Sequence, residues 1–182
     1  MPQAAEAYIR LMRAIELEGP ETVSAIITEP ILMSAGVVMP PDSYLRALRE
    51  VCDEHDMLLI FDVVITGFGR TGRWFAAEHA GAWPDIFCCG KGVTGGYSPL
   101  SIVFMTERVA EPFWGAPGRQ LMAGHTYGGN PVACAARWQR SSTCRRTTSS
   151  GRRNGAARTC AIACATWPSA IRRSNWCVVG GC

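Results

Sequence analysis

Short apolar segments alternate with amphipathic segments along the first hundred residues, and this alternation limits the fold more than any other feature of the chain. Four apolar runs have the length and residue types of strands: residues 23–28, 57–61, 85–89 and 101–105. Residues 2–18 and 41–55 carry apolar residues at three- and four-residue spacing, which predicts helices. Strands that are apolar throughout and alternate with helices favour parallel pairing in a sheet buried on both faces. We therefore predict an α/β fold with a mostly parallel sheet and flanking helices.

Two charged residues stand directly after predicted strands. Asp62 follows the strand at residues 57–61, and Lys91 follows the strand at residues 85–89, between two glycines. In open parallel sheets, ligands bind beyond the carboxyl ends of the strands. We therefore expect Asp62 and Lys91 to meet in one ligand site.

Each of these two residues has a chemical and a plain interpretation. Lys91 is the only lysine of the chain. A lysine amine can form a Schiff base, whereas an arginine guanidinium cannot; the alternative is codon usage that favours arginine and leaves one lysine by chance. Asp62 either caps the following turn or pairs with a buried cation, such as a protonated pyridine nitrogen.

The charge and composition of the chain change abruptly near Arg137. Residues 1–136 hold all fifteen acidic residues and have a net charge of −6, whereas residues 137–182 hold nine arginines and no acid. This tail is rich in Arg, Cys and Ser and has no Leu, Phe or Tyr. We predict one domain over residues 1–136, and a tail over residues 137–182 that is disordered or translated out of frame. The alternative is an authentic basic tail that binds nucleic acid or an acidic partner.

Several other classes of protein are not favoured by the sequence. No apolar run reaches the length of a membrane span, and the first residues do not form a secretory leader, so we expect a cytoplasmic protein. Cys160 and Cys164 are not accompanied by a histidine or a second cysteine pair, so no metal site is predicted.

A series of short motifs identifies a family that the chain resembles. In order, the motifs are Glu29-Pro30-Ile31 with Ser34-Ala35-Gly36-Val37, Phe61-Asp62-Val63-Val64-Ile65-Thr66-Gly67-Phe68-Gly69-Arg70-Thr71-Gly72, Pro84-Asp85-Ile86, Gly90-Lys91-Gly92, and His125-Thr126-Tyr127-Gly128-Gly129-Asn130-Pro131-Val132-Ala133. They closely resemble the class III aminotransferases, which are pyridoxal 5′-phosphate (PLP) enzymes of fold type I. The resemblance covers residues 20–136 and implies part of the large PLP-binding domain, incomplete at both ends.

The resemblance also implies a role for four residues. Lys91 would bind PLP covalently and then move the proton as general base and acid. Asp62 would pair with the pyridinium nitrogen, and Val64 would pack on the ring face. Thr126 would reach the cofactor phosphate of the neighbouring subunit, so the site would need a homodimer. His125 and Tyr127, on either side of Thr126, are interpreted as structural.

The implied reaction moves an amino group from an amine or amino acid to a 2-oxo acid. Alternatives are a PLP-dependent aminomutase of the same family, or a non-catalytic remnant whose basic tail binds nucleic acid. Val63 stands where the family usually has Glu, which places the local hydrogen bonding in question. Ser34 and Ile65 favour the ω-amino acid:pyruvate type. Because the domain is incomplete, we expect a poorly soluble chain with impaired activity.

Overall fold

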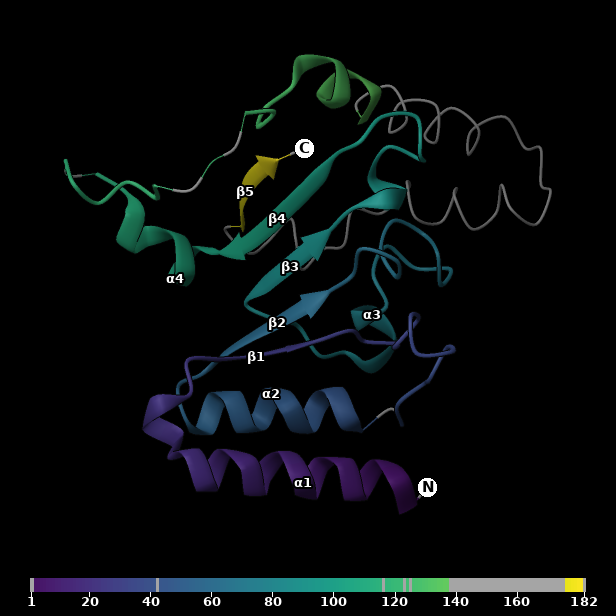
Figure 1. The fold of residues 1–182 in the computed structure, drawn as a ribbon, viewed down its shortest axis with the longest axis vertical. Coiled ribbons are helices and arrows are strands. Elements are labelled where there is room, and N and C mark those ends of the chain that lie inside the picture. Colours follow the sequence, from purple (N-terminus) through teal and green to yellow (C-terminus); the bar gives the residue numbers. More distant parts are fainter. Residues whose placement is uncertain are drawn as a thin grey trace.

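The computed structural model describes residues 2–41, 43–115, 117–122, 124, 126–137 and 176–181 (Figure 1). The strands form one sheet in the order β1-β2-β3-β4-β5. Their bounds are β1 (Ala25–Thr28), β2 (Leu58–Asp62), β3 (Ile86–Cys89), β4 (Ser101–Thr106) and β5 (Trp176–Gly181). The predicted strands are therefore confirmed, with ends that differ by one or two residues. Strand β5 lies within the tail, where no strand was predicted.

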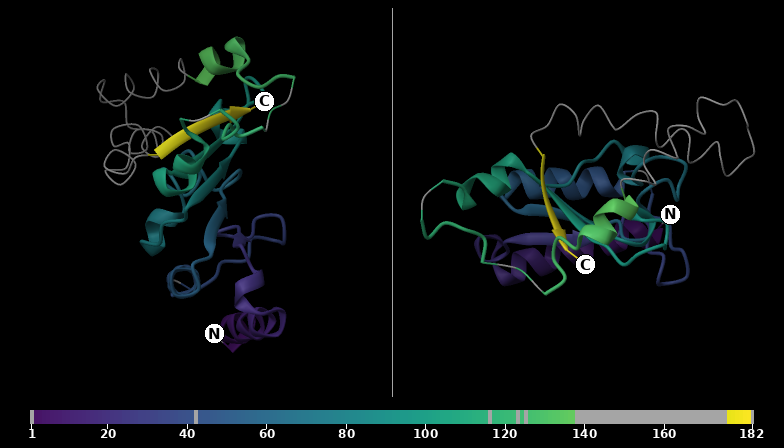
Figure 2. Two further views of the ribbon diagram at one scale, coloured as in Figure 1. Left: turned by 90° about the vertical axis from the view of Figure 1, so that its left-hand side faces the viewer. Right: turned by 90° about the horizontal axis from the view of Figure 1, so that it is seen from above.

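The helices follow the apolar periodicity of the sequence. Their bounds are α1 (Pro2–Glu18), α2 (Tyr44–Glu54), α3 (Ala77–Ala80) and α4 (Glu107–Ala110), with 3-10 turns η1 (Pro20–Thr22), η2 (Lys91–Val93) and η3 (Glu111–Phe113). Helix α1 has the predicted bounds and ends before Gly19, whose φ of 83° is favourable for glycine. In Figure 1 and in the left-hand view of Figure 2, α1 lies at the end of the molecule farthest from β5.

The direction of the strands agrees with the prediction for three of them. Strand β1 pairs parallel to β2, and β2 pairs parallel to β3. Strand β4 runs antiparallel to β3, and β5 runs antiparallel to β4. The reason for the reversal is that only residues 90–100 join β3 to β4, and they contain one 3-10 turn. A parallel crossover usually needs a dozen residues or more and a helix. The α/β class and the mostly parallel sheet are nevertheless confirmed.

One face of the sheet carries the core. Leu59, Phe61 and Phe87 are completely buried there, together with Leu48 of α2. Phe75, from the segment between β2 and β3, stacks on Phe87 with ring centroids 4.8 Å apart. Burial of these side chains supplies the main force that holds α2 and this segment on the sheet.

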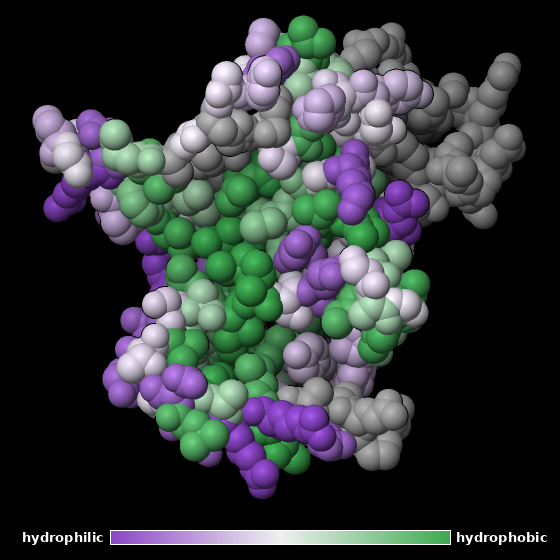
Figure 3. All heavy atoms as spheres, viewed as in Figure 1, coloured by the Kyte–Doolittle hydropathy of each residue, from purple (hydrophilic) through white to green (hydrophobic). Residues whose placement is uncertain are grey.

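The opposite face is largely open, so the expectation of a sheet buried on both faces is wrong for this chain. Ile27 of β1 is 65% exposed, and Ile60, Ile86 and Val103 on the same face are only partly covered. Figure 3 shows apolar residues across the centre of the molecule in this view. Side chains of helix α2 and of residues 63–84 cover the other face, where they belong to the core cluster.

A buried carboxylate fastens the amino ends of the strands. Asp85 accepts hydrogen bonds from the Leu59 N–H at 2.9 Å, from Arg49 Nη1 at 2.8 Å and from Arg108 Nη2 at 3.1 Å. Burial by itself raises the pKa of Asp85, but these donors and the arginine charges outweigh it and hold the pKa below its ordinary value. This network joins helices α2 and α4 to the sheet.

Candidate functional site

The carboxyl ends of β2 and β3 bring two of the predicted residues to one edge of the sheet. Asp62 is the last residue of β2, and its register partner is Cys88 of β3. The backbone N–H of the next residue donates to the carbonyl of Cys88 at 2.9 Å. Lys91 opens η2, three residues beyond Cys88. Three residues of chain span at most about 11 Å, so Lys91 lies close to the end of the Asp62 strand.

Asp62 is held at the edge by its own chain. Its Oδ1 atom accepts a hydrogen bond from the Val64 N–H at 2.9 Å. The carboxylate is half-buried, and its other oxygen receives no hydrogen bond from the residues that the structure describes. The turn-capping interpretation therefore explains one oxygen of Asp62, and the second oxygen is available to a ligand.

Val64 lies between Asp62 and the glycine that precedes Lys91. A Cβ atom built on Gly90 would come within 3.3 Å of Val64 Cγ1. The side chain of Val64 is half-buried, whereas Lys91 is exposed. A carboxylate, an apolar side chain and an amine-bearing residue therefore lie on neighbouring segments of one strand edge.

Thr126 lies in a different part of the described chain. It is exposed in the turn at residues 126–129, just before the helix at residues 131–137. Asn130 Oδ1 accepts hydrogen bonds from the N–H groups of Val132 and Ala133 at 3.0 and 3.1 Å, which caps this helix. Within the described ranges, no hydrogen bond joins Thr126 to Asp62 or Lys91. His125 lies outside the described residues, and Tyr127 is 68% exposed.

Val63, which the sequence analysis noted as a departure from the family, is completely buried. The structure also draws attention to Thr66 and Phe68, whose contacts the sequence analysis did not predict. Thr66 is 1% exposed, and its hydroxyl has no hydrogen-bond partner among the described residues. Phe68 has a φ of 53° and contacts Trp74 and Phe75 edge to face. Only the Gly-Phe-Gly sequence hinted at this turn, and the aromatic contacts have no local signal.

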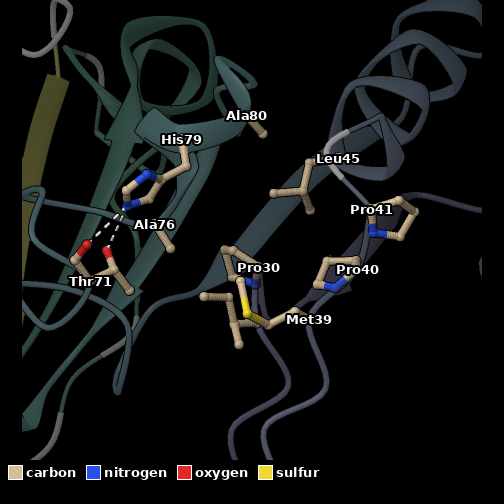
Figure 4. Close-up of a pocket in the computed structure, with 10 residues that line it drawn as sticks. Pro30, Met39, Pro40, Pro41, Leu45, Thr71, Ala76, His79 and Ala80 are labelled. Atoms are coloured by element: carbon tan, nitrogen blue, oxygen red, sulfur yellow. Dashed lines mark hydrogen bonds between the residues drawn. The ribbon is translucent and has the colours of Figure 1, made fainter.

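A cavity of about 380 Å³ lies elsewhere, between the loop after β1 and helix α3 (Figure 4). Apolar side chains, among them Pro30, Met39 and Leu45, form most of its lining. His79 Nε2 lies 3.1 Å from the Thr71 carbonyl oxygen and 3.2 Å from Thr71 Oγ1. None of the four predicted site residues lines this cavity, so it is separate from the strand-edge site.

Two further observations concern metals and membranes. In the part of the chain that the structure describes, no three His, Cys, Asp or Glu side chains are grouped so that they could hold a metal ion. Over the same residues, no helix has the length and apolar character of a membrane span.

Comparisons with known proteins show the family of the chain. The family model of class III aminotransferases matches residues 2–145. The chain therefore belongs to the class III aminotransferase family. It is 42% identical over 130 residues to an ω-amino acid–pyruvate aminotransferase of Pseudomonas putida, and 45% identical over 127 residues to a probable aminotransferase of Mycobacterium tuberculosis.

Solved structures show the same relationship. An amine transaminase from an uncultivated Pseudomonas species, described in its PLP-bound form, superposes with a TM-score of 0.72 at 38% identity. A thermostable ω-transaminase from Thermomicrobium roseum gives a TM-score of 0.69 at 39% identity. These matches cover 81% and 80% of this chain and 35% of each solved chain.

The chain represents only part of its relatives. The matches to the P. putida and M. tuberculosis proteins cover 69% of this chain, but 29% and 27% of those proteins. The shared part contains the β2 and β3 edges with Asp62 and Lys91.

Proposed function

We propose that this chain is the cofactor-holding part of a PLP-dependent aminotransferase. One observation carries the proposal: Asp62 ends one of two parallel strands, Lys91 follows the end of the other, and Val64 is bonded to Asp62 and lies against Gly90, the residue before Lys91. Family membership supports it, because a solved relative is described in its PLP-bound form.

The residues at this edge fit the cofactor. The free oxygen of Asp62 would pair with the pyridine nitrogen and keep it protonated, while the Val64 N–H holds the other oxygen in place. Val64 would offer an apolar surface to the ring. Lys91 would bind the cofactor through its amine and afterwards carry a proton to and from the reacting carbon. PLP supplies the electron sink for this chemistry when it is bound.

The proposed reaction transfers an amino group from an amine or amino acid to a 2-oxo acid. Its relatives include ω-amino acid–pyruvate, β-alanine–pyruvate and putrescine aminotransferases. All of these names denote transamination, but the named substrates differ. The proposal therefore covers the reaction class and does not name a substrate. An ω-amino acid and pyruvate are the first pair of substrates to assay.

We further propose that the site is completed in a homodimer, with Thr126 serving the cofactor phosphate of the neighbouring subunit. Support comes from Met122 and Val132, which lie within six residues of Thr126 in the sequence and are 93% and 71% exposed. Large apolar side chains that gather at a surface are typical of protein contacts. Sedimentation of the purified chain measures the assembly directly, and a strict monomer at micromolar concentration would reject the dimer.

The division of the chain belongs to the same proposal. We retain residues 1–136 as the enzyme-derived part and residues 137–182 as an out-of-frame tail, on the composition change near Arg137. Resequencing the DNA across codons 130–145 tests the frame, and an uninterrupted frame would refute the shift. The cytoplasmic location stays a prediction, which cell fractionation checks.

The absorbance of bound cofactor tests the proposed function. With added PLP, the wild-type chain should develop a visible band that is absent in Lys91→Ala and in the charge-preserving Lys91→Arg, because arginine keeps the charge but cannot form the covalent bond. The sample then receives an ω-amino acid and pyruvate, and the amino product is measured. A band of equal strength in Lys91→Ala would disprove the assignment of the lysine.

A further inference from the structure

The two glycines beside Lys91 are packed against the loop that follows β2. A Cβ atom on Gly90 would lie 3.3 Å from Val64 Cγ1 and 3.5 Å from Val64 Cγ2. A Cβ atom on Gly92 would lie 3.1 Å from Phe68 Cβ and 3.3 Å from the Gly67 carbonyl oxygen. The distances of 3.1 and 3.3 Å are shorter than an ordinary contact of a Cβ atom, so a side chain at either position would force the loop to move by a few tenths of an ångström.

Lys91, between these contacts, has an unusual backbone conformation. Its φ is 39°, in the left-handed region that non-glycine residues rarely adopt. Such a conformation persists only where the surroundings impose it, and it is frequent at functional sites. Contacts on both sides of Lys91 should therefore impose its positive φ.

The segment after Lys91 is fixed by burial and hydrogen bonds. Val93 is completely buried, and its N–H donates to the Gly90 carbonyl at 3.0 Å, closing a turn around Lys91. Thr94 is 1% exposed, and its hydroxyl donates to the Ser98 carbonyl at 2.6 Å. Lys91 thus lies between a buried anchor on its carboxyl side and the packed Gly90 on its amino side.

The same loop also holds the carboxylate of the site. The Val64 N–H donates to Asp62, while the Val64 side chain packs on Gly90. One residue therefore connects the position of the carboxylate with the backbone that carries the amine. A change in the Val64–Gly90 contact should alter the position of Lys91 relative to Asp62.

From these contacts we infer that Val64 and Phe68 clamp Gly90 and Gly92, and that this clamp fixes the direction in which Lys91 leaves the backbone. Gly90 and Gly92 are then positioning residues for the lysine. The inference rests on the proposed function and deepens it. The lysine stem is flexible, so the clamp sets the origin and direction of the side chain and leaves its outer bonds free.

The experiment uses four variants of the full chain with added PLP. Gly90→Ala introduces the Cβ atom, Val64→Ala removes both atoms that it would meet most closely, and the double variant combines the two changes. Gly124→Ala is the matched control, because a Cβ atom there meets nothing within 4 Å. The readouts are the rate at which the Lys91-dependent band develops, its dependence on pH, and the midpoint of thermal unfolding without cofactor.

The clamp predicts a specific pattern among these variants. Gly90→Ala should slow band formation about fivefold to tenfold and shift its pH midpoint, because overpacking by one methyl displaces backbone or side chains. The double variant should return to within about twofold of Val64→Ala, since the space for the methyl is restored. Gly124→Ala should match the wild type. An unchanged rate in Gly90→Ala, or no recovery in the double variant, would overturn the clamp.

The design separates failure of the clamp from failure of the proposed function. If the wild type forms no Lys91-dependent band, the proposed function fails, and the clamp is judged from thermal unfolding alone. Gly90→Ala should then lower the unfolding midpoint by several degrees, and Val64→Ala should suppress that decrease in the double variant. If the midpoint shift of the double variant equals the sum of the shifts of the two single variants, Val64 does not press on Gly90.

Discussion

Asp85 illustrates how one side chain can serve several elements that are distant in the sequence. It lies between Arg49 and Arg108 and also accepts the Leu59 N–H, while Asp53 and Asp56 bind the outer sides of the two arginines. The exposed Arg49–Asp53 and Arg108–Asp56 pairs contribute little to stability, because water screens their charges. The inner pair of Arg49 and Asp85 is mostly buried, so its loss would leave a charge without its partner.

Asp85→Asn should lower the free energy of unfolding by about 2–3 kcal/mol. Removing one partner of a fully buried ion pair would cost more, but Arg108 is half exposed. Urea unfolding measures the change. Asp53→Asn is the matched control, since Asp53 is 67% exposed, and it should change stability by less than about 0.5 kcal/mol. Equal effects of the two substitutions would contradict the buried network.

The stability should also depend on pH through Asp85. Its pKa is lower in the folded state than in the unfolded state, so the unfolded state binds more protons between the two pKa values. The contribution of Asp85 is therefore complete above the unfolded pKa of about 3.9, and it is lost as the pH falls through the lower folded pKa. Urea midpoints from pH 7 to pH 2.5 should fall less steeply for Asp85→Asn than for the wild type.

The residues of the site differ in how far the sequence reveals them. Lys91 and Asp62 are predicted because each follows an apolar strand within a family-like motif. The packing of Phe68 on Gly92, and the orphan hydroxyl of Thr66, depend on contacts across the loop that no local pattern encodes. Residue type and strand position are thus predictable, whereas the fit between two loops is not.

Among the elements, helix and strand positions are predicted well because their apolar periodicity is strong. The direction of β4 is not predicted, because an apolar run indicates a strand without indicating whether it pairs parallel or antiparallel. The short link at residues 90–100 would have indicated the antiparallel pairing.

Strand β5 is a different case: its backbone pairs with all of β4, from Ser101 opposite Gly181 to Thr106 opposite Trp176. Backbone pairing needs no selected side chains, so an out-of-frame segment can still complete a sheet edge.

Deleting residues 176–182 should leave the outer edge of β4 without its partner. Unpaired strand edges associate with one another, so the shortened chain should aggregate faster than the full chain at equal concentration. Light scattering during incubation at 25 °C follows the process. Unchanged scattering would show that β5 does not protect this edge.

The molecule as a whole has one covered face and one open apolar face. Ile26 and Ile27 are neighbours in β1 that point to opposite faces, and they are 9% and 65% exposed. The chain spans less than a third of the length of the P. putida and M. tuberculosis relatives. This open face is the physical basis for the expected poor solubility.

Substituting the two isoleucines separately tests this difference. Ile27→Thr should leave the free energy of unfolding within about 0.5 kcal/mol of wild type and reduce binding of an apolar dye, because it removes exposed apolar surface. Ile26→Thr should instead destabilise by about 1–3 kcal/mol, since it places a hydroxyl in the core. Dye fluorescence and urea unfolding of both variants provide the comparison, and a larger loss of stability from Ile27→Thr would reverse the assignment of the faces.

The most direct measurement traps the cofactor on the chain and locates it. The wild-type chain is mixed with PLP, reduced with borohydride, digested and mapped by mass spectrometry. The modified amine should be Lys91, and the yield at limiting PLP should fall about tenfold or more in Asp62→Asn, whose neutral side chain cannot stabilise a pyridinium ion. Modification confined to the terminal amine, or an equal yield on Lys91 in Asp62→Asn, would contradict a cofactor site shared by these two residues.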